Sequence, residues 1–361
     1  IANGVMTDQS HLIPKINSQT TSLTQVFDKL STSLINVAKY AVGAFAFYGA
    51  MSVIGETINQ IVQYDQALKD LQAITSATDF QTEMFGQTIK DVAGKTKFSV
   101  SEVAEGMKNL GQAGFSAAET IEVIDDAAIL ATGTLSKFDT VTDLLTTTIR
   151  AYHLEATESG RLTDLFANAI NRSKLNVDKL RVAFNYLASV ADKANISVDD
   201  SVTLMGMLAN AGVRASTIGT SLRQVIEGLV SPSKQFNDAI QRAGYTADQF
   251  VVSAANPLED VIRRLQKVVP DAAAAFDLFG IRGAPAVSAI TSHGVEGFTR
   301  MKEAMQESGS AAKMAEIQME GLANKAKNMR DKFELVAVAL GEAGVKTALE
   351  EIGRASCRER V

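Results

Sequence analysis

One stretch of the sequence, residues 98–121, predicts a pair of consecutive helices more clearly than any other. Ser99 is followed three residues later by Glu102, and Ser116 by Glu119. This spacing is typical of a capping box, in which the hydroxyl and the carboxylate each satisfy a backbone N–H that the first helical turn leaves without a partner. Each pair therefore marks the start of a helix.

The first of these helices has an equally clear end at Gly114 and Phe115. Glycine readily takes the left-handed conformation that ends a helix, and an apolar residue directly after it can fold back onto the last turn, here onto Leu110. The second helix is expected to run to about Ala131. The two helices should pack as a hairpin with a short turn.

A weaker copy of this stretch lies 98 residues later in the chain. Ser197 corresponds to Ser99 and Gly212 to Gly114, with methionine, leucine and alanine at matching positions between them. The likeness has two explanations, which the sequence leaves open. It reflects an internal duplication, or it arises because capped amphipathic helices share the same few signals.

Several segments share their order and spacing with a known family. They are Phe98-Ser99-Val100-Ser101-Glu102-Val103-Ala104, Leu110-Gly111-Gln112-Ala113-Gly114-Phe115-Ser116, Leu130-Ala131-Thr132, Met207-Leu208-Ala209-Asn210-Ala211-Gly212-Val213 and Gly219-Thr220-Ser221-Leu222-Arg223. Together they resemble the conserved core of phage tail tape measure proteins, over about residues 64–245. Residues 214–218 replace a small Gly-Ser turn that is more common in the family, which leaves the geometry of that turn open.

The resemblance implies a structural protein of a tailed phage or prophage, with no enzymatic activity and no cofactor. Such a protein occupies the lumen of the tail tube, sets tail length, scaffolds assembly in the host cytoplasm and leaves ahead of the DNA. The implied partners are the tail-tube (major tail) protein, tail assembly chaperones, baseplate or tail-tip proteins, further copies of the chain and, during ejection, the host membrane.

The distribution of proline and the absence of strand patterns predict an all-α fold. The chain has five prolines, four of them at or beyond Pro232, and no tryptophan. No stretch alternates apolar and polar residues with the period of two that strands need. We expect a compact multi-helix domain of short capped helices and hairpins, flanked by longer N- and C-terminal amphipathic helices.

Changes in pattern divide the chain into five expected regions. They are a lead-in with an apolar helix (1–57), the helical tape measure core (58–232), a helical satellite interrupted by prolines (233–296), a long heptad-patterned helix (297–350) and a tail (351–361) that resembles the translation of a sequencing adapter. With no initiating methionine at Ile1, we expect the chain to be a truncated fragment.

The apolar positions of the fourth region follow a heptad. From Ala315 to Leu340 they advance by alternating steps of four and three residues. This pattern permits a left-handed coiled coil. It equally permits one long helix that lays its apolar stripe on the preceding domain, and the sequence leaves both open.

An uncharged run at residues 40–55 is the candidate for membrane contact, through Phe45, Phe47, Met51 and Ile54. It is shorter than the roughly 20 residues that span a bilayer, so a buried or amphipathic helix is the simpler interpretation. A rival hypothesis for the whole chain, a membrane-active pore former, depends on this run.

No residues with the spacing of a catalytic, metal or nucleotide site are found. His11, His153 and His293 are isolated from one another, and Gly94-Lys95-Thr96 lacks the leading glycine of a phosphate loop. The net charge of -6 does not indicate a basic surface for nucleic-acid binding. A chain whose one cysteine is Cys357 cannot form an internal disulfide. A second rival remains, the non-catalytic part of a tail-associated cell-wall hydrolase.

Two pairs of adjacent acids, Asp125-Asp126 and Asp199-Asp200, complete the candidate polar residues. Neighbouring residues on a helix point in different directions, so neither pair can share a proton. We expect both pairs to be solvated residues at helix starts, where a carboxylate also suits the helix dipole.

Overall fold

The structure is a computed structural model that describes residues 62–321. All described residues belong to one compact unit of the chain. They include no strand, only an isolated bridge between Ser253 and Asn256. The predicted all-α fold class is therefore confirmed, while the expected N-terminal flanking helix lies outside the described residues.

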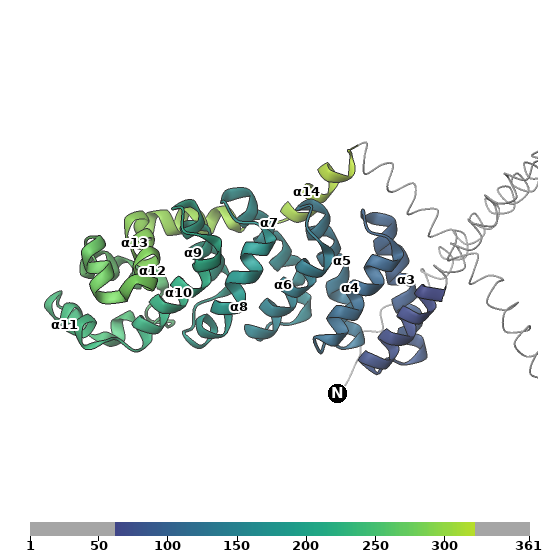
Figure 1. The fold of residues 1–361 in the computed structure, drawn as a ribbon, viewed down its shortest axis with the longest axis horizontal. Helices are drawn as coiled ribbons and strands as arrows, with labels where there is room; N and C mark the ends of the chain where they lie inside the picture. The colour runs from purple at the N-terminus through teal and green to yellow at the C-terminus, as the bar shows by residue number, and fades with distance from the viewer. Residues whose placement is uncertain (1–61, 322–361) are drawn as a thin grey trace, which may run out of the picture. The chain divides into compact units, whose positions relative to one another are not determined.

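Short helices follow one another with tight connections (Figure 1). After a helix over residues 62–75 they are α3 (Asp79–Lys95), α4 (Val100–Gln112), α5 (Ala117–Gly133), α6 (Phe138–Ala151), η2 (Ala156–Glu158), α7 (Ser159–Arg172), α8 (Val177–Lys193), α9 (Val198–Asn210), α10 (Ala215–Val230), α11 (Lys234–Arg242), η3 (Ala247–Phe250), α12 (Leu258–Val268), α13 (Ala272–Met305) and α14 (Ser310–Met319).

The helices from α3 to α10 form two rows. Each helix packs on the next but one in the chain, which places α3, α5, α7 and α9 in one row and α4, α6, α8 and α10 in the other. Consecutive helices also contact each other, α7 and α8 through the rings of Phe166 and Phe184. This is the packing of stacked helical hairpins, in which each hairpin buries its apolar face against its neighbours.

The two rows help to decide between the two explanations for the weaker copy of residues 98–121. The helix that begins after Ser99 is α4, and its copy after Ser197 is α9, so the two lie in opposite rows. A shift along the array by whole hairpins cannot superpose them. The structure therefore favours the second explanation, that the two helices look alike because they use the same caps and apolar spacing.

Most of the described helices of the array end with the same backbone hydrogen bond around a residue in the left-handed conformation. After α4, the N–H of Phe115 donates to the carbonyl of Leu110 around Gly114, whose φ is 85°. The same six-residue closure occurs after α5, α6 and α8, where the left-handed residue is Leu135, His153 or Asn195. It is the Schellman motif, which satisfies carbonyls that a helix end leaves free and turns the chain back sharply.

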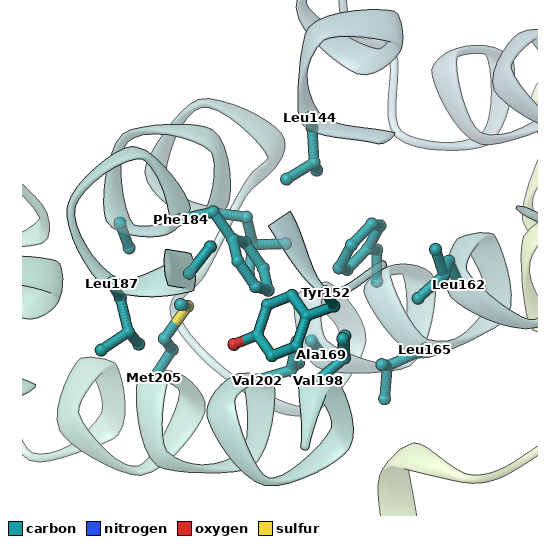
Figure 2. Packing of buried hydrophobic residues seen from close by; sticks show 14 of the residues in the cluster. Leu144, Tyr152, Leu162, Leu165, Ala169, Phe184, Leu187, Val198, Val202 and Met205 are labelled. Atoms are coloured by element: carbon teal, nitrogen blue, oxygen red, sulfur yellow. The ribbon is translucent and has the colours of Figure 1, made fainter. Parts of the chain in front are cut away.

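The core between the rows is filled by apolar side chains from α6, α7, α8 and α9 (Figure 2). At its centre the Phe184 ring meets Tyr152 and Phe166 edge to face, with ring centroids 6.2 and 5.8 Å apart. The Tyr152 hydroxyl donates to Ser201 Oγ at 2.8 Å, and burial raises its pKa, so the phenol stays neutral.

After α10 the chain turns back along the array (Figure 1). Helix α13 packs on α12, α10, α9 and α7, and α14 packs on α7 and α5. Two glycines with positive φ, Gly280 and Gly294, kink α13 so that it can follow this path. Helices α13 and α14 therefore form a return segment that covers the row of α5, α7 and α9.

The geometry left open at residues 214–218 is helical from Ala215, and Arg214, the N-cap of α10, provides no side-chain cap. Two expectations about the later regions differ from the structure. Residues 233–296, expected as a satellite, include most of α13, which packs on the array itself. Residues 297–321 are not one helix, because the chain is non-helical between Met305 and Ser310; the rest of the expected heptad helix lies outside the described residues.

By length and composition, α13 is the one described helix that could cross a membrane. Within its most apolar window, 44% of the residues are buried among the other helices. This finding is weak evidence for a span.

Candidate functional site

The hairpin of α4 and α5 contains most of the residues singled out from the sequence: Ser99 and Glu102 at its start, and Gly114, Phe115, Ser116 and Glu119 at its turn. The Ser99 and Ser116 hydroxyls accept from the N–H groups of Glu102 and Glu119, each at 3.3 Å. The glutamate carboxylates accept in return from the serine N–H groups at 2.9 and 2.8 Å. These bonds lower the pKa of Glu119, the backbone N–H of Ser116 contributing most.

Arg150, at the end of α6, closes the same turn from outside the hairpin. Its guanidinium lies 4.1 Å from the centre of the Phe115 ring and donates to the Gly114 carbonyl at 2.7 Å. It also lies 3.6 Å from the Glu119 carboxylate. No local sequence pattern points to this residue, because it reaches the turn from a third helix.

The remaining predicted residues lie in the second half of the array. Ser197 caps α9 by accepting from the N–H of Asp200 at 3.1 Å, and Gly212 ends that helix with a φ of 86°. Gly219 lies in α10, where a Cβ would stand 2.5 Å from the backbone oxygen of Ala183 in α8. It permits the close contact between these two helices, which no local pattern predicted.

The other sequence candidates contribute no site to the described part of the chain. Phe45, Phe47, Met51 and Ile54 lie outside it, as do His11 and Cys357. His153 occupies the left-handed position after α6, and His293 Nδ1 contacts the Ala289 carbonyl 2.8 Å away. Among residues 62–321 no group of three His, Cys, Asp or Glu side chains could hold a metal ion.

A polar stripe on α7 holds the link between α13 and α14, and sequence analysis missed it. The Asp164 carboxylate accepts from the N–H groups of Gly309 (2.7 Å) and Ala311 (3.0 Å). It thus caps α14, whose own N-cap, Gly309, has no side chain to do so. We call Asp164, Asn168, Asn171 and Arg172, which share one face of α7, the α7 clasp.

Asn168 is the buried centre of the α7 clasp, with 2% of its surface exposed. Its amide donates to the carbonyl of Met305, the last residue of α13, at 3.0 Å and to that of Glu307, in the link, at 2.7 Å. Nearer solvent, Asn171 donates to the sulfur of Met314 at 3.1 Å, and Arg172 pairs with Glu307 at 3.2 Å. The clasp therefore satisfies both helix ends at the link.

Lys302 joins α13 to two further helices. Its ammonium lies 2.7 Å from the Asp200 carboxylate of α9 and 3.2 Å from the Glu259 carboxylate of α12. Desolvation acts to lower its pKa, but the hydrogen bonds and negative charges of Asp200 and Glu259 raise it above the ordinary value. The lysine thus stays charged and fixes the return segment to the array.

The acids expected to be solvated are partly buried, so that expectation is wrong for Asp126 and Asp200. Asp126 lies in the middle of α5, where the Ser159 hydroxyl donates to its carboxylate and burial raises its pKa. Asp200 is 8% exposed and pairs with Lys302. Both face neighbouring helices that the sequence pattern does not reveal.

Asn168→Ala is expected to lower the free energy of unfolding by about 1–3 kcal/mol, because it leaves the Met305 and Glu307 carbonyls without their donor. Urea denaturation followed by circular dichroism measures this change. The control is Asn171→Ala, an exposed residue of the same clasp, which should change stability by no more than about 0.5 kcal/mol. Equal effects of the two substitutions would contradict a central role for Asn168.

These features hold helices together and offer no nucleophile with an adjacent base. The comparisons with known proteins agree with a structural role. A family model described as phage-related minor tail protein matches residues 86–280, just over half of the chain. No solved structure matches the chain.

Two curated relatives carry related names. The tape measure protein of Pneumococcus phage Dp-1 is 28% identical over 286 residues, which are 76% of this chain and 24% of that protein. The probable tape measure protein of Escherichia phage P2 is 27% identical over 94 residues, 26% of this chain and 12% of that protein. The chain thus spans a quarter or less of the length of either relative.

The family expected from the short segments is confirmed by these matches, which also support a structural role among the components of a phage tail. The chain belongs to the phage-related minor tail protein family, together with the phage tape measure proteins that it matches.

Proposed function

We propose that the chain is part of the tape measure protein of a tailed phage or prophage. In this role the full protein scaffolds assembly of the tail tube, sets tail length and assists genome ejection. The observation that carries the proposal is the match to the Dp-1 tape measure protein over 76% of the chain. The absence of a catalytic arrangement among residues 62–321 supports a role without enzymatic activity.

Within such a protein, the described helices would be a folded module rather than the ruler. Helices stacked side by side in two rows add little length, whereas an extended helix adds about 1.5 Å per residue. The length-setting part would therefore lie in other regions of the full protein.

The proposed location is the lumen of the virion tail, reached from the host cytoplasm during assembly. The proposed partners are the tail-tube protein, the tail assembly chaperones, baseplate or tail-tip proteins and further copies of the chain. Contact with the host membrane during ejection would use residues 40–55. A net charge of -6 favours passage of DNA without tight binding, because the protein gives phosphates no overall attraction.

Deleting whole heptads from the full-length protein, outside the described module, should shorten tails by about 1.5 Å for each residue removed. Electron microscopy of purified particles measures tail length. As a control, replacing the same heptads with unrelated helical sequence of equal length should leave tails unchanged. Tails of wild-type length after deletion would refute the length-setting role.

A further inference from the structure

A largely apolar groove lies between α3, α5 and α14. It has a volume of about 420 Å³, and Ile129, Ala315 and Met319 provide apolar lining. Thr132 also lines it, with no exposed surface and no hydrogen-bond partner for its hydroxyl.

The rim of the groove is acidic. Asp125, Glu316 and Glu320 surround it, against a single cation, Lys95, whose ammonium lies 3.9 Å from the Asp125 carboxylate. An apolar lining within a negative rim suits an amphipathic helix that presents an apolar stripe flanked by lysine or arginine.

The chain itself contains such a sequence directly beyond the groove. Met319 lines the groove, and two residues later the described chain ends. Residues 322–340 carry the heptad apolar positions found in the sequence, including Leu322, Met329 and Phe333. They also carry four cations, Lys325, Lys327, Arg330 and Lys332, against two acids.

We propose that the groove binds the apolar stripe of residues 322–340 of the same chain. The apolar positions would fill the lining, and the cations would face the acidic rim. A segment that begins at the edge of the groove closes only a short loop to reach it, whereas a separate partner loses its translational freedom on binding. Of the two alternatives for the heptad pattern, the groove therefore selects the helix laid on the preceding domain.

Hydrogen exchange of the full chain, followed by mass spectrometry, tests the proposal. We expect the amides of residues 322–340 to exchange at least about tenfold more slowly than in either of two groove variants. Ile129→Lys puts a charge in the lining, and Glu316→Lys with Glu320→Lys reverses the rim without touching the core. The matched control is Ile317→Lys, at a 59% exposed residue of α14 outside the groove, which should exchange like the parent.

Three results would overturn the proposal. Residues 322–340 could exchange without protection in the parent itself, which means that the groove does not bind them. Their protection could survive both groove variants, which places the stripe elsewhere, as in a coiled coil. Their protection could disappear on dilution, which makes a second copy the occupant. Unchanged exchange in α8 verifies that each variant is folded.

Discussion

Phe184→Ala is expected to lower the free energy of unfolding by about 3–5 kcal/mol, because it removes a large side chain from a filled core. Phe184 is 1% exposed and lies where α6, α7, α8 and α9 meet (Figure 2). The substitution also removes two edge-to-face ring contacts, with Tyr152 and Phe166. The cavity cannot close unless helices from both rows move together.

Urea or thermal denaturation of the full chain measures the effect of Phe184→Ala. The matched control is Phe80→Ala, the same change at a residue of α3 that is 71% exposed. The control should alter stability by no more than about 0.5 kcal/mol. If Phe184→Ala changed stability by less than about 1 kcal/mol, the core in Figure 2 would not be packed as described.

Gly219→Ala, which adds a single methyl group, is expected to lower the free energy of unfolding by about 2–3 kcal/mol, the second large effect. The new Cβ would lie 2.5 Å from the backbone oxygen and 2.8 Å from the Cα of Ala183. Because these are backbone atoms, no side chain can rotate away, and α10 must move off α8. This cost outweighs the gain of up to about 1 kcal/mol that alanine brings to a helix interior.

Gly160→Ala is the control for Gly219→Ala. In α7 a Cβ at position 160 would meet its nearest neighbour, Asp126 Oδ2, at 3.5 Å, an ordinary contact. This substitution should therefore leave the fold unchanged or stabilise it by up to about 1 kcal/mol. The two alanine substitutions should thus change the free energy of unfolding differently, Gly219→Ala lowering it and Gly160→Ala leaving it unchanged or raising it. Equal denaturation midpoints would show that α8 and α10 are not in close contact.

Helix starts could be predicted from the sequence because their signals are local. Ser99 with Glu102 and Ser116 with Glu119 bond within one turn, so residue type and spacing were enough. Helix ends were predicted most clearly where glycine marked them, as at Gly114. Leu135 takes the left-handed conformation although its residue type does not favour it, and the tertiary structure holds it there.

The α7 clasp could not be predicted. Asp164 and Asn168 look like ordinary polar residues of an amphipathic helix, and their partners are more than 130 residues away in the sequence. The same holds for Asp200, whose expected solvation was wrong because it is buried and pairs with Lys302 of α13. A periodic pattern assigns polar residues to solvent and does not reveal a later segment that returns to cover them.

The sequence by itself determined that this chain is helical, where several helices begin and which family it resembles, because caps, turns and apolar spacing act within a few residues of one another. Only the tertiary structure decided the two-row order of the helices, the path of α13 and α14 and the contact at Gly219. These features depend on contacts between distant segments, whose energies come from how side chains fit and not from the local pattern.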